Sequence, residues 1–274
     1  MNISTSKAGP TWPLVFVALT MFPLFGVLPN HAQTTQPATT TAPVAAPSIP
    51  SGTLLPVVLR TPLSFDKSKQ GQILRGKIAQ DVPLPNGSKI RKGSTIEGHV
   101  TQVTPNASTE GSKVTLEFDK MDVDGQWVPV VTNLRAIAGF MTVIQANIPD
   151  EAPAEGSPYN WLPKTQIGGD SVYGVGGPVM SAEDDSKVIG KSTPDGVLGQ
   201  VSAREGSPCR GAVDGNNHSQ ALWVFSSDAC GAYGIDHLKI DHSGRCDPKG
   251  KIILASDARK LQLRDGDGLL LRVN

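Results

Sequence analysis

The chain has 274 residues, of which 29 are Gly, 22 are Pro and 18% are charged. Ordinary domains carry about 25% charged residues, so this chain is comparatively poor in charge. Its 25 basic and 25 acidic residues give a formal net charge of zero, which excludes a general attraction to nucleic acid or to an anionic membrane surface. Once the ends are set aside, the length suffices for two domains of about 100 residues, each with its own core.

Residues 1–32 are typical of an export signal. Lys7 gives a weakly positive start, residues 12–28 form an apolar run, and residues 30–32 end in a small residue suited to cleavage. The alternative is an uncleaved membrane anchor, but the run is short for a span and two prolines interrupt it. We favour cleavage and expect a periplasmic or extracellular protein, with membrane contact only if this segment is retained.

Residues 33–51 are predicted to be a disordered linker. They consist mainly of Thr, Ala and Gln punctuated by four prolines, so they have little apolar surface to bury. In an extended polyproline conformation, at about 3.1 Å per residue, such a stalk reaches roughly 50–60 Å.

Residues 52–146 are predicted to form a β domain. Within residues 113–120 every second residue is apolar, which is typical of a strand with one buried face. Asp124 and Gly125 then supply the backbone conformation that a tight hairpin turn requires before a second strand at residues 126–131.

Two earlier segments, residues 72–82 and 96–101, alternate in the same way. Gly76 and Gly98 fall inside them on the apolar faces, where glycine marks a bend, a bulge or a close approach of backbones. Because closing a sheet needs such bends, we expect a small barrel or sandwich.

These segments resemble the TrbI-type barrel of conjugation and type IV secretion systems. The resemblance rests on residues 72–82 (QILRGKIAQDV), with a strand ending in an Asp-Val pair, and on residues 90–100 (IRKGSTIEGHV), with a Gly-Ser turn followed by a strand. An alternating strand and an Asp-Gly hairpin follow in that family, as they do here. The family's layout of membrane segment, Pro-rich periplasmic stalk and barrel also fits residues 1–146, so the resemblance implies a barrel in the cell envelope.

Residues 147–196 are expected to connect this domain to a second one. They are rich in Gly and Pro, and their glycine clusters fit neither the dinucleotide fingerprint nor the P-loop spacing, so we predict no cofactor.

Residues 197–274 are predicted to form a second, Cys-containing β domain. Residues 221–226 read as a compact apolar strand, and four more strands are expected at residues 237–241, 251–255, 260–264 and 269–273. The region also resembles the C-terminal regions of uncharacterised exported bacterial proteins, which implies no particular chemistry.

The three cysteines predict a disulfide, because exported proteins meet an oxidising environment. Of the three possible pairings we favour Cys209–Cys230, which closes a loop of about 20 residues and contributes roughly 3 kcal/mol in the chain-entropy model. Cys246 is then free or available to pair between molecules.

No catalytic or metal motif stands out. His237, His242 and the cysteines lack any Cys-x-x-Cys or His-x-x-x-His pair, so no metal site is predicted. Neither a Gly-x-Ser-x-Gly elbow nor a His-Glu-x-x-His motif occurs.

Two functions are open. The first is a non-enzymatic structural or interaction protein of the cell envelope, with envelope proteins or a second copy of itself as partners and with Trp127 and Trp223 as candidate contact residues. The second is a secreted hydrolase of polysaccharide or peptidoglycan that uses carboxylates of the second domain, with Asp214, Asp228 and Asp236 as candidates.

Overall fold

The computed structural model describes residues 48–105, 111–150, 162–201, 209, 218–241, 248–258 and 260–274. The predictions for residues 1–32 and for residues 33–47 of the linker lie outside this range. The described chain is almost entirely β, with a single short helix, which confirms the all-β class. No helix within these residues is long and apolar enough to cross a membrane.

The largest sheet has the strand order β16-β9-β20-β1-β3-β6-β7-β18-β17. β8 pairs with residues 120–123 of β7, beyond the part of β7 that pairs with β18. All pairs are antiparallel except β16–β9. In chain order the strands are β1 (Leu54–Leu59), β3 (Ile73–Ile78), β6 (Thr95–Thr104), β7 (Ser112–Val123), β8 (Gln126–Pro129), β9 (Thr132–Ala138), β16 (Gly231–Tyr233), β17 (Leu238–Ile240), β18 (Ile252–Ser256) and β20 (Gly268–Val273).

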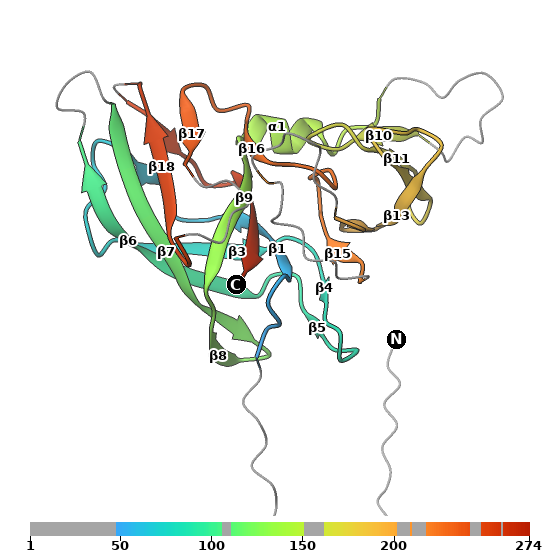
Figure 1. The fold of residues 1–274 in the computed structure, drawn as a ribbon, viewed down its shortest axis with the longest axis horizontal. Helices are drawn as coiled ribbons and strands as arrows, with labels where there is room; N and C mark the ends of the chain where they lie inside the picture. The colour runs from blue at the N-terminus through green and yellow to red at the C-terminus, as the bar shows by residue number, and fades with distance from the viewer. Residues whose placement is uncertain are drawn as a thin grey trace, which may run out of the picture. The chain divides into compact units, whose positions relative to one another are not determined.

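This sheet curls into a barrel-like shape (Figure 1). β16 and β17 stand at opposite ends of the strand order, yet they follow each other in the chain and contact each other. The inside is filled by one apolar cluster to which almost every strand contributes. The strands therefore surround a packed core.

The strands differ in how many of their faces are buried. β3 and β7 alternate between buried and exposed residues, because one face meets the core and the other meets water. β1, β9 and β20 are buried along nearly their whole length. In β20, Leu269 and Leu271 face the inner core, whereas Leu270 belongs to a second apolar cluster outside it.

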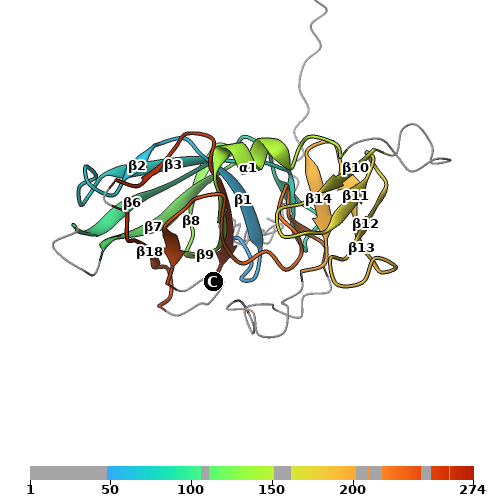
Figure 2. The same cartoon turned by 90° about the horizontal axis from the view of Figure 1, so that it is seen from above.

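A second sheet covers that outer face. It has the order β10-β11-β12-β13-β14-β15 and consists of β10 (Pro163–Thr165), β11 (Ser171–Tyr173), β12 (Pro178–Met180), β13 (Val188–Thr193), β14 (Gly196–Gly199) and β15 (Gln220–Ala221). Its apolar residues share the second cluster with Leu54, Ala136 and Leu270 of the first sheet. Figure 2 shows β10 to β14 grouped beside the barrel.

Three small elements complete the described fold. β2 (Leu63–Ser64) pairs with β19 (Gln262–Leu263), and β4 (Val82–Pro83) pairs with β5 (Lys89–Ile90). The helix α1 (Phe140–Gln145) follows β9 directly and buries Val143 in the second cluster.

Several local predictions are confirmed. β7 and β8 form the expected hairpin, with positive φ at Asp124 (51°) and Gly125 (84°). At Gly98 the register of β6 against β7 shifts, and a β-carbon there would collide with the Glu117 carbonyl. A β-carbon at Gly76 would collide with Val57. Both glycines therefore mark a bulge or a close approach.

The first sheet takes strands from both ranges that sequence analysis treats as separate domains. β20 lies between β9 and β1, and β18 pairs with β7. Residues 147–196, expected to be a connection, contain four strands of the second sheet. Period-two alternation indicates a strand but not the identity of its partner. This is why the observed strand pairing crosses the predicted boundaries between the domains.

The predicted strand at residues 221–226 is wrong beyond its first residue. β15 ends at Ala221, and a looped segment, residues 222–230, follows. Buried side chains bind the backbone of this loop, and a single bridge, in which Ile167 donates to the Val224 carbonyl and accepts from the Ser226 N–H, is its one pairing of strand type among the described residues. The four later strands appear as β17, β18, β19 and β20, within two residues of their predicted bounds.

Candidate functional site

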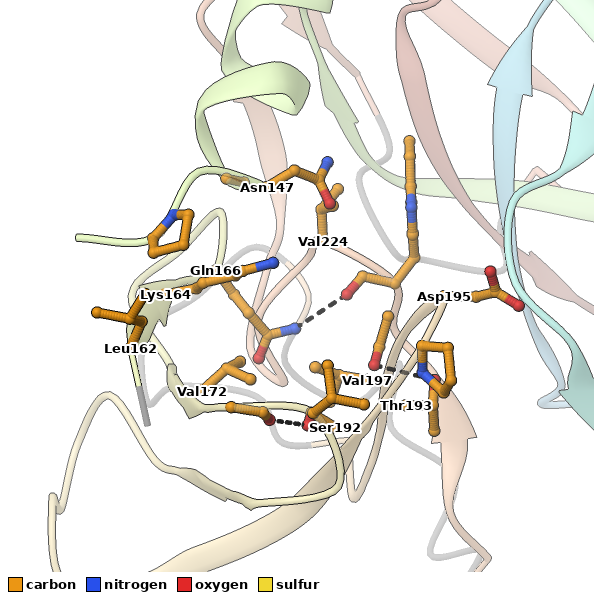
Figure 3. A pocket seen from close by; sticks show the side chains of 17 residues that line it. Asn147, Leu162, Lys164, Gln166, Val172, Ser192, Thr193, Asp195, Val197 and Val224 are labelled. Carbon is orange, nitrogen blue, oxygen red and sulfur yellow. Dashed lines mark hydrogen bonds between the residues drawn. The ribbon is translucent and has the colours of Figure 1, made fainter. Parts of the chain in front are cut away.

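A pocket of about 230 Å³ lies between the C-terminal end of α1, the second sheet and the 222–230 loop (Figure 3). Its apolar lining comes from Ala146, Pro149, Leu162, Val172, Val175, Pro194, Val197, Trp223 and Val224. Its polar lining comes from Asn147, Lys164, Gln166, Ser192, Thr193 and Asp195. Elements distant in sequence thus build one small, mainly apolar site.

Two buried glutamines hold the pocket wall at Trp223. This residue has a left-handed backbone, with φ at 55°, which is unusual for a large side chain. Its N–H donates to Gln80 Oε1 at 2.7 Å, and its carbonyl accepts from Gln166 Nε2 at 3.4 Å. Gln80 also donates to the Val197 carbonyl at 3.0 Å. The strained backbone is therefore fixed from two sides, by Gln80 between β3 and β4 and by Gln166 between β10 and β11, as is common at functional positions.

The Trp223 ring is half-buried. It meets Phe225 edge-on, with ring centres 6.3 Å apart, and lies against Gly268, where a β-carbon would touch the ring. The residue predicted as a contact aromatic thus lines the pocket.

Most polar groups of the pocket already have partners in the protein. The Ser192 hydroxyl donates to the Gly174 carbonyl, and the Thr193 hydroxyl donates to the Gly196 carbonyl at 3.0 Å. Asn147 Nδ2 donates to the Val143 carbonyl at 2.8 Å, and Asp195 pairs with Lys92. These hydroxyls act as structural donors, an arrangement that does not suit nucleophilic attack.

Two polar groups differ from the rest. Gln166 is only 4% exposed and its Oε1 has no hydrogen-bond partner within the described residues, although its Nε2 donates to the carbonyls of Trp223 and Phe225. Lys164 forms no ion pair with any described residue. In Figure 3 its side chain extends from β10 toward the interior of the pocket.

The second predicted contact aromatic lies elsewhere. Trp127 is on β8, is 54% exposed, and does not line this pocket. Lys120 Nζ sits 5.2 Å from its ring centre and also pairs with Glu97 at 2.6 Å. Trp127 is therefore an exposed ring beside a charged network on the outside of the barrel.

The predicted disulfide Cys209–Cys230 is confirmed, with 5.9 Å between its Cα atoms. It fastens the 222–230 loop near β9, where the fully buried Arg135 donates to the carbonyls of Ala229 (2.9 Å) and Ser227 (3.0 Å). Burial lowers the pKa of Arg135 to about 10, so the guanidinium stays charged at neutral pH. Cys246 lies outside the described residues.

Of the three carboxylates proposed for hydrolysis, the structure describes Asp228 and Asp236, and these two do not line a common pocket. Asp228 accepts from the Ser226 hydroxyl at 2.9 Å, and Asp214 lies outside the described residues. Asp236 lines a different pocket, to which Asp228 does not contribute and which also holds Asp66 and Asp267.

Asp267 is the buried carboxylate of this second pocket. Its two oxygens accept the N–H groups of Phe140 (2.8 Å) and Arg264 (2.7 Å). Burial raises the pKa of Asp267 above its usual range. The carboxylate thus anchors the start of α1 and the turn before β20.

Within the residues that the structure describes, no group of three or more His, Cys, Asp or Glu side chains is placed to hold a metal ion. His237 Nδ1 lies 2.7 Å from Asp257 Oδ1 on the surface, and His242 is not described.

Sequence reasoning missed Gln80, Lys164 and Gln166. Single polar residues in strands and loops carry no periodic signal, and their partners lie far away in sequence. A scan against protein-family models finds no match for the chain, and a search of curated proteins finds none either.

Proposed function

We propose that this chain is an exported, non-enzymatic protein of the cell envelope that acts by binding, with a TrbI-like barrel, which residues 52–146 share with the C-terminal strands, as part of its scaffold. One observation carries the proposal: a small pocket whose strained wall, Trp223, is held by Gln80 and Gln166. A site in which backbone strain is supported by buried hydrogen bonds is preorganised for a ligand.

The disulfide supports the exported location. Disulfides persist in oxidising compartments and are rare where glutathione keeps thiols reduced. Cys209 is fully buried, and the bond stabilises the loop that carries Trp223. Binding activity and export are thus linked, because reduction in the cytosol weakens the loop that builds the site.

The test is to recover the full chain from its natural host after cell fractionation. We expect it in the envelope or periplasmic fraction, with Cys209 and Cys230 protected from alkylation until a reductant is added. Cross-linking in that fraction, with light scattering on the purified protein, then identifies an envelope partner or a self-assembly. A cytosolic protein with alkylated Cys209 would overturn the exported location, and a strict monomer without cross-linked partners would overturn the interaction role.

A secreted hydrolase is the second candidate. The observation that favours it is the second pocket, where Asp66, Asp236 and the buried Asp267 line one cavity and burial raises the pKa of Asp267. A carboxyl with a raised pKa is suited to donate a proton to a leaving group. Release of reducing ends from peptidoglycan or polysaccharide, lost in Asp236→Asn but retained in Asp228→Asn, would establish this function in place of the first.

A further inference from the structure

The pocket at Trp223 has two polar groups to offer a ligand. Gln166 Oε1 is a hydrogen-bond acceptor without a partner among the described residues, and Lys164 is a cation without a carboxylate partner there. An unpartnered buried acceptor costs free energy, so a ligand that brings an N–H or O–H recovers it. A cation that extends into the pocket favours an anionic group.

The size of the pocket limits the ligand. A volume of about 230 Å³ is below the roughly 300–1,000 Å³ of sites for drug-sized molecules. Its walls are mainly aliphatic, with Val172, Val197 and Val224 lining the pocket together with the half-buried Trp223. The ligand portion that enters is therefore small and apolar.

The polar groups favour a peptide end over a sugar. A saccharide ring presents several hydroxyls, each of which needs a partner. The donors of Ser192, Thr193 and Asn147 are already engaged with backbone carbonyls. One acceptor and one cation match the single N–H and the single carboxylate of a terminal amino acid.

We propose that this pocket binds the free carboxylate end of a short apolar peptide, with Lys164 pairing with the carboxylate and Gln166 Oε1 accepting the last peptide N–H. The aliphatic walls and the Trp223 ring hold the terminal side chain. Two carbonyls fix the Gln166 amide, since Nε2 donates to both Trp223 and Phe225, so Oε1 has a set direction.

A small side-chain movement completes the site. Gln166 Oε1 is shielded from water, so a ligand N–H reaches it only after a lining side chain rotates. The ammonium group of Lys164 can also move, because its flexible four-carbon stem lines the pocket without an ion pair to a described residue. The carboxylate of the ligand would draw its ammonium group into the new position.

The test measures binding of N-acetyl-valyl-valine by calorimetry to the full chain with its disulfide intact. The matched ligand is the same dipeptide with a C-terminal amide, and glucuronic acid serves as an anionic sugar. We expect the free acid to bind at least about tenfold more tightly than the amide, a difference of about 1.4 kcal/mol. Lys164→Met should weaken binding of the acid by a similar factor and leave binding of the amide unchanged.

Lys191→Met is the control variant. Lys191 is exposed on β13 of the same sheet but does not line the pocket, so this substitution should leave the affinity unchanged. The proposal would be overturned if the acid and the amide bound equally well, or if both variants lost the same affinity for the acid. It would also be overturned if glucuronic acid bound more tightly than the dipeptide, or if the dipeptide did not saturate the protein up to about 10 mM. The inference rests on the proposed binding role. The outcome of the dipeptide titration does not depend on where the protein is located in the cell, so its failure can be distinguished from failure of the fractionation test.

Discussion

Arg135 shows how single buried residues shape this protein. It sits where the register of β9 against β20 shifts, so that Leu270 faces Ala136 and Leu271 faces Leu134. The extra residue of the bulge points its guanidinium at the 222–230 loop and donates to two carbonyls there. Asp170, also fully buried, accepts N–H groups from Ala182 and Ser227. Side chains thus satisfy loop backbone groups that strand pairing leaves unbonded.

Glu97 gives a pH-dependent prediction at the same scale. It is 8% exposed and pairs with Lys120 at 2.6 Å and Arg75 at 2.9 Å. Hydrogen bonds from these partners lower the pKa of Glu97 below its ordinary value of 4.5. Its pairs therefore stabilise the fold above pH 4.5, and this contribution is lost as the pH falls through the lowered pKa.

We expect Glu97→Gln to reduce the free energy of unfolding by about 1 kcal/mol at neutral pH, because both partners are partly exposed and screened. Urea unfolding of both proteins across a pH series measures this difference in the free energy of unfolding. The curves of the two proteins should converge as the pH falls below 4.5 and through the lowered pKa of Glu97. A constant difference from neutral to acid pH would show that Glu97 acts through packing and not through its charge.

At the scale of elements, the sequence distinguishes strands with one buried face from strands with two. The alternation in β7 marks a face toward water, whereas the continuous apolar runs of β1 and β20 reflect a core on each side. The shared face of Leu269 and Leu271 is readable from the chain. The cover over Leu270 is not, because it comes from a second sheet.

Gly98 provides the test at this scale. The backbone of β7 passes so close that a β-carbon at Gly98 would meet the Glu117 carbonyl and the Phe118 Cα. Gly98→Ala must push the two strands apart at the bulge, and we expect a loss of about 2 kcal/mol or more in the free energy of unfolding.

The matched control is Lys113→Ala, an exposed change on the neighbouring strand β7, which should stay within about 0.5 kcal/mol of the parent. The midpoints of urea unfolding for the parent protein and the two variants measure these changes in stability. An unchanged midpoint for Gly98→Ala would mean that the strands lie farther apart than the structure places them.

At the scale of the whole molecule, the two ends of the described chain meet in one sheet. Residues 45–274 form a single compact unit, and β20 pairs with both β1 and β9. A fragment of residues 48–146 therefore lacks the strand between β1 and β9, and it also lacks β18 beside β7. The inner core of the fragment is left open to water.

We expect this fragment to remain unfolded or aggregated, whereas residues 48–274 unfold in one cooperative transition. Thermal melts followed by circular dichroism, with amide dispersion in NMR spectra, distinguish the two results. A well-dispersed spectrum from the fragment alone would show that residues 52–146 form an independent barrel and that the C-terminal strands are additions to it.

The disulfide closes a loop between Cys209 and Cys230 within the second half of the chain, and its effect on stability concerns the whole fold. The two cysteines are 21 positions apart, so reduction should lower the free energy of unfolding by about 3 kcal/mol. The double variant Cys209→Ser, Cys230→Ser should reproduce that loss. Cys246→Ser is the matched control and should leave both stability and its response to reductant unchanged. Equal stability with and without reductant would contradict a structural role for the bond.

The all-β class, the hairpin at Asp124 and Gly125 and the bend at Gly98 can be read from the residues alone, which also predict a disulfide and favour Cys209–Cys230 among its three possible pairings. These depend on residues close together in the chain, or on the three pairings that three cysteines allow. The folded chain alone reveals which strands pair and that residues 222–230 form a loop. It also reveals that Lys164 and Gln166 line one pocket and that Gln80 supports its wall at Trp223. The physical reason is distance along the chain: Gln80 and Trp223 are 143 positions apart, and no local pattern records a hydrogen bond between them.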